Sequence, residues 1–158
     1  MKILALIPAR MASSRFPGKP MEKILKKPMI GHVYDNVKKN SLLTSTVVAT
    51  CDNEIGDYIK SINGRYVMTG IHHKRATDRC AEALKIVEKE DKIKYDIVIM
   101  IQGDEPMINS SMISEGLQPM IDNPSLKITN LMGKIENNNE FKDQNVVKVV
   151  CDIAGNAL

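Results

Sequence analysis

Short apolar runs alternate with stretches of helical periodicity along this chain. The apolar runs that predict strands cover residues 2–8, 45–50, 65–69 and 96–102. Helical patterns lie between them, and these predict helices over residues 29–39, 53–62, 77–90 and 110–121. This regular alternation predicts an α/β fold, in which a mostly parallel sheet forms the middle of three α/β/α layers.

The strand predicted over 96–102 has the most continuous apolar pattern. Its central residues, 97–101, are all apolar, which is typical of a strand that is buried on both faces. Two later runs, 127–131 and 146–151, also predict strands, and the polar stretch 136–140 predicts a loop or a helix start. Ala157 and Leu158 begin what would be a partner strand for 146–151. Because unpaired sheet edges are normally covered, we expect either a fragment or a protein that needs a partner.

Composition limits the classes of protein that the chain can represent. A chain of 158 residues with 43% hydrophobic content fits one domain, residues 1–158, with a buried core. The net charge of +3, without basic runs interleaved with aromatic residues, argues against a nucleic-acid surface. The first strand resembles neither a signal peptide nor a membrane span, so we expect a cytoplasmic protein with no membrane contact. The spacing of Cys51, Cys80 and Cys151 favours reduced thiols over disulfides or a zinc site.

The loop after the first strand concentrates positive charge. It carries Arg10, Arg15 and Lys19 together with Ser13 and Ser14, and prolines and a glycine at 17–20 restrict its backbone. Ligands of open α/β sheets bind at the carboxyl ends of the strands. The loop therefore predicts a site for a small, highly anionic ligand such as a nucleoside triphosphate. A solvated surface loop is the alternative.

A second candidate site follows the strand 96–102, where the sequence reads Gln102-Gly103-Asp104-Glu105-Pro106. A carboxylate after a buried strand, with a glycine that permits close approach, suits Mg²⁺, which takes one or two protein carboxylates and substrate phosphate oxygens. We expect Asp104 to be the metal ligand. Glu105 is expected to point the other way, and an ion pair or a helix cap near Ser110 is its alternative role.

The third element is the charged loop at residues 72–79, which leads into a helix. Its two adjacent histidines cannot share one metal from a helix or strand face, so zinc is not expected. Thr77 is predicted to cap the helix, and Asp78 suits its N-terminal dipole, which is a sufficient structural explanation for both. In the functional alternative, Arg79 and the loop close over the bound ligand.

Together these motifs resemble the 3-deoxy-manno-octulosonate (Kdo) cytidylyltransferases, the CMP-Kdo synthetases of Gram-negative envelope biosynthesis. The likeness is carried by residues 7–20, 27–30, 48–50, 68–69, 77–79, 102–108 and 145–150. It implies a nucleotide-diphospho-sugar transferase (Rossmann-like) fold and transfer of CMP from CTP to Kdo, with release of pyrophosphate, for lipopolysaccharide biosynthesis. It also implies Mg²⁺ as cofactor and a possible homodimer. The family continues past the position of Leu158, so we expect a C-terminal part of its fold, including a second metal-binding aspartate, to be missing.

The resemblance also implies roles for single residues. Nucleotide binding is implied for Pro8, Ala9, Arg10, Ser13, Arg15, Lys19, Thr77 and Gln102. Catalysis is implied for Arg10, Lys19 and Asp104, with Asp104 as the metal ligand, and contact with the sugar acid for Arg79 and Gln102.

One short segment departs from the family pattern. Lys74-Arg75-Ala76 stands where the family has Gln-Ser-Gly, so that Arg75 and Ala76 replace a small Ser-Gly pair, and a backbone that needs positive φ would tolerate this poorly. Two alternatives to Kdo transfer stay open: a non-catalytic CTP-binding fragment, and transfer to another sugar acid, such as an amino-substituted Kdo or a nonulosonate.

Overall fold

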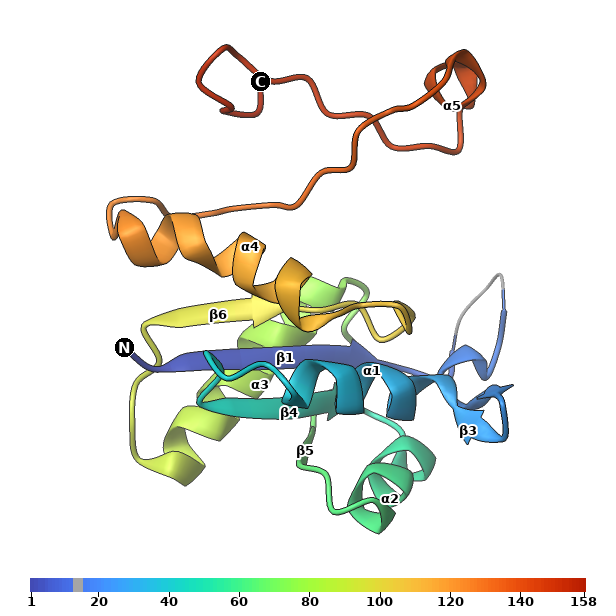
Figure 1. Ribbon diagram of the computed structural model, residues 1–158. Helices are drawn as coiled ribbons and strands as arrows, with labels where there is room; N and C mark the ends of the chain where they lie inside the picture. Colours follow the sequence, from blue (N-terminus) through green and yellow to red (C-terminus); the bar gives the residue numbers. More distant parts are fainter. Residues whose placement is uncertain (13–15) are drawn as a thin grey trace.

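The computed structural model describes residues 1–12 and 16–158. Its centre is a parallel sheet in the order β5-β4-β1-β6 (Figure 1). The strands are β1 (Ile3–Ala9), β4 (Ser45–Thr50), β5 (Tyr66–Met68) and β6 (Ile97–Met100). Three of them lie within the predicted ranges, β1 ends one residue beyond its range, at Ala9, and the predicted parallel sheet is confirmed.

Strand β1 lies inside the sheet, with a parallel neighbour on each side. Leu4 of β1 pairs with Ser45 of β4 on one side and with Val98 of β6 on the other. Because these strands run in the same direction, their carboxyl ends meet at one edge of the sheet. The chain continues from β1 toward the short 3₁₀ helix η1 (Lys19–Met21) and a small hairpin of β2 (Lys23–Ile24) and β3 (Lys27–Pro28).

Helices cover both faces of the sheet, which confirms the three layers. The side chains of β1 alternate between the two faces of the sheet and so contribute to two separate cores. Ile3, Ala5 and Ile7 point to one face, and Leu4 and Leu6 point to the other. The first face packs against α1 (Met29–Lys38), α2 (Asn53–Ser61) and α4 (Ser110–Asp122). The second face packs against α3 (Ala76–Asp91). None of the helices in the described chain is long and apolar enough to cross a membrane.

Strand β6 is covered on one face only, so the expectation of burial on both faces is wrong. Ile97 is buried against the α4 side, whereas Val98 and Met100 are each 37% exposed. The physical reason is the position of α3, whose buried side chains contact β1, β4 and β5 and leave the outer face of β6 uncovered.

The strands predicted over 127–131 and 146–151 are not formed in the described structure. These residues belong to the segment 123–158. Residues 127–131 line a groove beside β6 and α4, and the later part of the segment extends away from the sheet (Figure 1). Within it, Asn137 caps the short helix α5 (Asn138–Lys142), which confirms a helix start, and Cys151 forms an isolated antiparallel bridge with Ala157. A strand needs a partner for its backbone groups, and apolar side chains such as Val147 remain exposed here.

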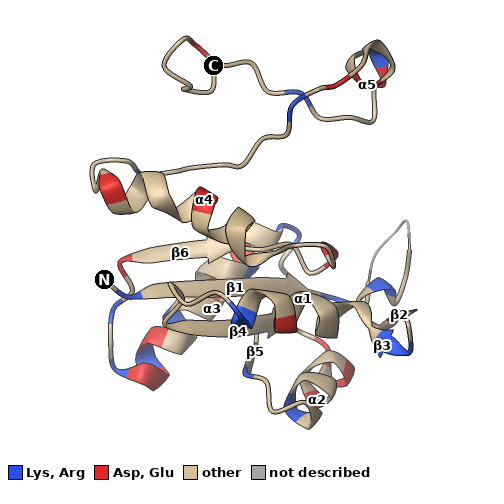
Figure 2. Cartoon of the chain, in the orientation of Figure 1, with Lys and Arg blue, Asp and Glu red and all other residues tan. Residues whose placement is uncertain are grey.

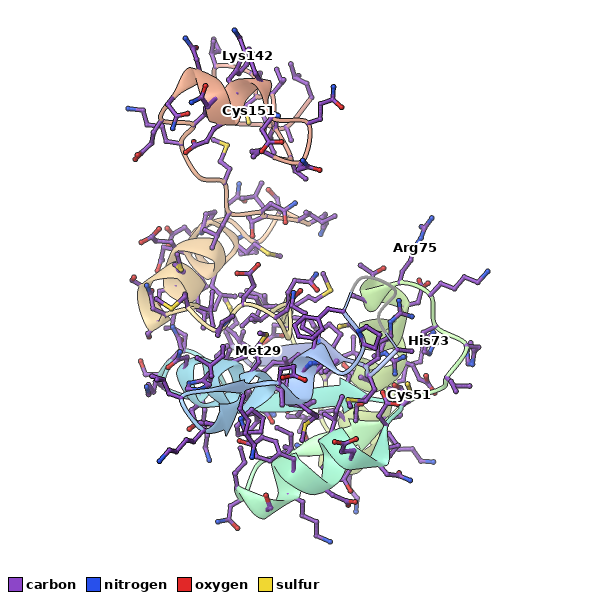
Figure 3. The ribbon with its side chains drawn as sticks, turned by 90° about the vertical axis from the view of Figure 1, so that its right-hand side faces the viewer. Met29, Cys51, His73, Arg75, Lys142 and Cys151 are labelled. Carbon is purple, nitrogen blue, oxygen red and sulfur yellow. The ribbon has the colours of Figure 1, made fainter. Side chains whose placement is uncertain are left out.

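The cysteines are free thiols. Cys80, in α3, is buried against the sheet, and Cys51 follows the end of β4. Cys151 lies in the C-terminal segment, well away from Cys51 (Figure 3).

Candidate functional site

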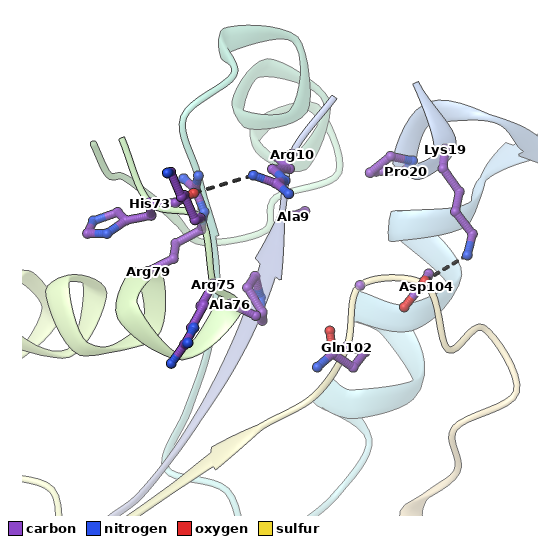
Figure 4. Close-up of a pocket in the computed structure, with 13 residues that line it drawn as sticks. Ala9, Arg10, Lys19, Pro20, His73, Arg75, Ala76, Arg79, Gln102 and Asp104 are labelled. Atoms are coloured by element: carbon purple, nitrogen blue, oxygen red, sulfur yellow. Dashed lines mark hydrogen bonds and ion pairs between the residues drawn. The ribbon is translucent and has the colours of Figure 1, made fainter. Parts of the chain in front are cut away.

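A cleft of about 250 Å³ opens at the carboxyl ends of β1 and β6 (Figure 4). Three parts of the chain form its walls: the end of β1 with the start of η1, the turn after β6, and the loop that leads into α3. The lining residues are 8–10, 19–20, 73–76, 79 and 102–104. The cleft therefore brings together the three segments that the sequence singled out.

Most of the residues expected at the site lie in this cleft. They are Pro8, Ala9, Arg10, Lys19, Arg79, Gln102 and Asp104. Ser13 and Arg15 lie outside the described residues.

Thr77 is placed differently from the other expected residues. It is exposed in the first turn of α3 and does not line the cleft. The prediction that it caps the helix is wrong, because α3 begins one residue earlier, at Ala76, and its N-cap is Arg75.

Lys19 and Asp104 form an ion pair at one side of the cleft (Figure 4). The Lys19 Nζ atom donates to Asp104 Oδ2 at 2.7 Å, and the two side chains are 35% and 45% exposed (Figure 4). The carboxylate is thus open to solvent and already holds a cation, the lysine ammonium. A hard-cation site that takes one protein carboxylate fits this arrangement. Glu105 lines the neighbouring groove beside α4, and Asn109 caps that helix instead.

Gly103 permits a close approach between the turn after β6 and strand β1. A Cβ atom at this position would lie 2.8 Å from the Pro8 carbonyl oxygen and 3.3 Å from Ile30 Cδ1. Any side chain would push the turn away from β1, because backbone cannot yield as a flexible side chain does. The glycine therefore sets how close Gln102 and Asp104 come to the end of β1.

Arg79 is a buried cation at the start of α3. Its exposed fraction is 3%, and its guanidinium donates to Thr69 Oγ1 and to Cys51 Sγ, the latter at 3.4 Å. Among the described residues, no carboxylate forms an ion pair with it. A buried charge without a counter-ion is costly in free energy. This favours Arg79 as a residue that binds an anion in the cleft, which it lines.

Glu82, which the sequence did not single out, holds the loop of residues 70–75 against α3. Its Oε2 atom accepts the Gly70 backbone N–H at 2.8 Å and contacts His73 Nε2. These contacts, with the Gly70 bond the larger cause, lower the pKa of Glu82. Its partners lie outside its own helix, so the helical pattern gave no signal of this role.

The same loop contacts the end of β1. Arg10 Nη1 lies 3.4 Å from the His73 carbonyl oxygen, to which it donates (Figure 4). The loop is therefore tied to α3 on one side and touches Arg10 on the other.

The departure from the family pattern at residues 74–76 causes no backbone strain, contrary to the expectation. Arg75 has an extended backbone, with φ −109° and ψ 146°, and Ala76 is the first residue of α3. The non-glycine residues with positive φ in the described chain are elsewhere: Leu25, Lys26, Asn63 and Lys92. A Cβ atom is therefore tolerated at both positions.

The cleft has a strongly positive lining. Arg10, Lys19, Lys74, Arg75 and Arg79 line it, against the single carboxylate of Asp104. Further basic residues surround η1 and the β2–β3 hairpin next to the end of β1 (Figure 2). Such a lining suits a ligand with several negative charges, and the lone carboxylate offers a place for a metal ion that accompanies it.

Comparison with known proteins agrees with this chemistry. The model of the family described as cytidylyltransferase matches residues 4–158. The chain belongs to the cytidylyltransferase family.

Two curated cytidylyltransferases illustrate the relationship. The 3-deoxy-manno-octulosonate cytidylyltransferase of Geobacter metallireducens is 41% identical over 100% of this chain and 60% of its own length. The enzyme of the same name from Trichlorobacter lovleyi is 42% identical over the same shares. The chain thus spans about 60% of the length of these cytidylyltransferases.

A solved cytidylyltransferase structure shares the fold. It is a CMP:2-keto-3-deoxy-manno-octonic acid synthetase complexed with CTP, and it is 40% identical to this chain. The TM-score is 0.70, and the match covers 80% of this chain and 50% of the other. The predicted nucleotidyltransferase fold is confirmed.

Proposed function

We propose that this chain binds CTP in the cleft at the ends of β1 and β6 and transfers CMP to a 3-deoxy-sugar acid of the Kdo type, releasing pyrophosphate. The observation that carries the proposal is the meeting of Arg10, Lys19 and Asp104 in one cleft. Relatives at about 41% identity that are named for this transfer support the choice of nucleotide and acid.

The proposed reaction forms one bond to phosphorus and breaks another. The anomeric hydroxyl oxygen of the acid attacks the α-phosphorus of CTP, and the bond from that phosphorus to the bridging oxygen of pyrophosphate breaks. The hydroxyl proton leaves to solvent. Arg10 and Lys19 neutralise phosphate charge, which is the main contribution that a protein makes to this reaction besides positioning. Lys74 and Arg75, in the loop that Arg10 contacts, add to the same positive field.

Asp104 is proposed to hold Mg²⁺. Its carboxylate is half-exposed and already faces a cation, which fits this role. The ion, when bound, would neutralise charge on the phosphate oxygens.

The remaining site residues are proposed to select the two substrates. The chain at Pro8 and Ala9 forms the cleft edge at the end of β1, where the base would lie. Arg79 has five N–H donors and uses only part of them on Thr69 and Cys51, so it can also receive the carboxylate of the acid. Gln102, from the turn after β6, offers an amide to the nucleotide or the sugar.

Pyrophosphate release tests the proposal directly. The chain is mixed with CTP, Mg²⁺ and Kdo, and with CTP and Mg²⁺ alone. We expect release that requires the acid, and we expect Asp104→Ala to abolish it. Glu105→Ala is the matched control, because this carboxylate lies in the same turn but lines a different groove. Undiminished release by Asp104→Ala would remove Asp104 from the site.

A second candidate is CTP binding without transfer. It is favoured by the lining of the cleft, whose cations suit the triphosphate of CTP. Titration calorimetry with CTP and Mg²⁺ separates the two candidates: binding without acid-dependent release supports the second, and the absence of binding contradicts both. Release with an amino-substituted Kdo or a nonulosonate, but not with Kdo, would show a different acceptor.

A further inference from the structure

We propose that Glu82 is a positioning residue of the cleft, which fixes the loop of residues 70–75 as one wall and, through His73, orients the side chain of Arg10. This inference rests on the proposed function, because it concerns the same cleft. Glu82 itself does not line the cleft. It acts through the loop.

The carboxylate of Glu82 receives two groups from the loop on one oxygen. The Gly70 backbone N–H donates to Oε2 at 2.8 Å, and the His73 ring contacts the same atom through Nε2. The His73 side chain is only 12% exposed, so its ring is enclosed in this position. One acidic side chain therefore holds the loop at its first residue and again at the residue that reaches the cleft.

We call the contacts of Glu82 with Gly70 and His73 the clasp. His73 connects this clasp to Arg10. While its ring is held by Glu82, its carbonyl oxygen accepts from Arg10 Nη1 at 3.4 Å. A contact of this length is weak, so it steers the guanidinium without binding it tightly. Arg10 can then turn to a phosphate without breaking a strong bond.

Charge explains why the loop needs a carboxylate. Lys74 and Arg75 line the cleft together with Arg10 and Arg79, and like charges at this spacing repel one another. In the described part of the chain, Glu82 is the acid that contacts the loop. Its pKa lies below the ordinary value because Gly70 and His73 donate to it, so it is ionised at neutral pH.

The loss of Glu82 should therefore loosen the loop and weaken nucleotide binding. CTP affinity in the presence of Mg²⁺ is measured by titration calorimetry for the unchanged chain, Glu82→Ala, Glu82→Gln and Lys85→Ala. We expect Glu82→Ala to weaken binding roughly tenfold, about 1.4 kcal/mol. Glu82→Gln should keep most of the affinity, because the amide oxygen accepts the same two bonds. Lys85→Ala, exposed on the same helix, should have no effect.

A double-mutant cycle tests the connection to Arg10. If the clasp works through this residue, Glu82→Ala should cost much less affinity when Arg10 is already alanine. An equal loss in both backgrounds, or unchanged binding by Glu82→Ala, would overturn the inference.

Hydrogen exchange provides a readout that needs no nucleotide. The Gly70 amide should exchange faster in Glu82→Ala than in the unchanged chain or in Lys85→Ala, while amides in the middle of α3 keep their protection. An unchanged Gly70 rate would show that the clasp does not hold. If the unchanged chain fails to bind CTP, the proposed function fails, and this exchange experiment still decides whether Glu82 fixes the loop.

Discussion

The side chains of Lys19 and Asp104, for which we propose roles in phosphate and metal binding, form an ion pair with each other. At 2.7 Å the ammonium occupies the carboxylate that the proposed metal ion would use. Both side chains are substantially exposed, so solvent screens the pair and little stability depends on it. In the proposed function, the pair would open so that Lys19 contacts a phosphate and Asp104 holds the metal ion.

Lys19→Met tests this competition. Loss of the charge should raise the activation free energy of pyrophosphate release by about 2–4 kcal/mol and slow the reaction accordingly, as for other preorganised groups that stabilise a transition state. The concentration of Mg²⁺ at half-maximal rate should fall, because Asp104 no longer has a competing cation. Steady-state rates over a Mg²⁺ series measure both effects. Lys23→Met, an exposed lysine of β2, is the control. An unchanged rate would show that Lys19 is a surface lysine without a part in the reaction.

Single residues also show what the sequence could reveal about the site. The glycine in Gln102-Gly103-Asp104 indicated a close approach, and the structure identifies the neighbour as the Pro8 carbonyl of β1. A glycine in the sequence indicates that a side chain would not fit at this position, but it does not identify the neighbouring atom that excludes the side chain. Glu82 gave no such sign, because its role depends on a loop that folds back onto its helix.

Among the secondary-structure elements, α3 is fastened at both ends. Glu82 holds the loop near its start, and Arg65, just before β5, holds its last turn. The Arg65 guanidinium makes a two-pronged contact with Asp91, Nη1 to Oδ2 at 2.9 Å and Nη2 to Oδ1 at 2.8 Å, and also reaches Glu90. Tyr95 donates its hydroxyl to Asp91 Oδ2 at 2.7 Å. This network lies at the end of α3 that is remote from the cleft.

The Asp91 network should make stability depend on pH. The Arg65 guanidinium, and then the Tyr95 hydroxyl, hold the pKa of Asp91 below its ordinary value. The stabilisation is therefore present above the unfolded-state pKa of about 3.9, and it is lost as the pH falls through the lower folded value. Urea unfolding at neutral pH should show Asp91→Asn to be less stable than the unchanged chain, with a smaller difference at pH values of about 3 or below.

The control for this pH experiment is Asp57→Asn, because Asp57 is exposed in α2 and lies outside the network. It should follow the unchanged chain at every pH. A difference between Asp91→Asn and the unchanged chain that stays constant into acid would contradict a role for the carboxylate charge.

The elements that the sequence predicted well are those that bury a regular apolar pattern, whether or not their partners are nearby in the chain. β1, β4 and the helices between them bury regular apolar patterns against one another, so local periodicity was a sufficient guide. Residues 146–151 have an equally apolar pattern, but a strand also requires a hydrogen-bonding partner, which the pattern does not contain. β6 shows the same limit, since its apolar outer side chains did not reveal that α3 leaves them uncovered.

For the molecule as a whole, the cleft lies where separate parts of the fold meet. Its lining comes from β1 in the middle of the sheet, from the turn after β6 at one edge, and from α3, which packs on one face. A ligand that contacts all three walls therefore adds bonds between segments that are distant in sequence. Binding in the cleft should therefore raise the free energy of unfolding of the whole fold and not only order one loop.

Thermal unfolding measures this coupling. At a CTP concentration about 100-fold above its Kd, with Mg²⁺ present, the native state should gain about 2.7 kcal/mol. For a chain of this length that corresponds to a rise in Tm of roughly 5–10 °C. CTP with a chelator, and CTP with Asp104→Ala, should both give a smaller rise, and the two reductions should match if Asp104 is the residue through which Mg²⁺ acts. GTP serves as the control for the base, because a purine should not fit the edge formed at Pro8 and Ala9. Equal rises with both nucleotides would mean that the cleft recognises the triphosphate alone, and a chelator effect that persists in Asp104→Ala would place the metal ion elsewhere.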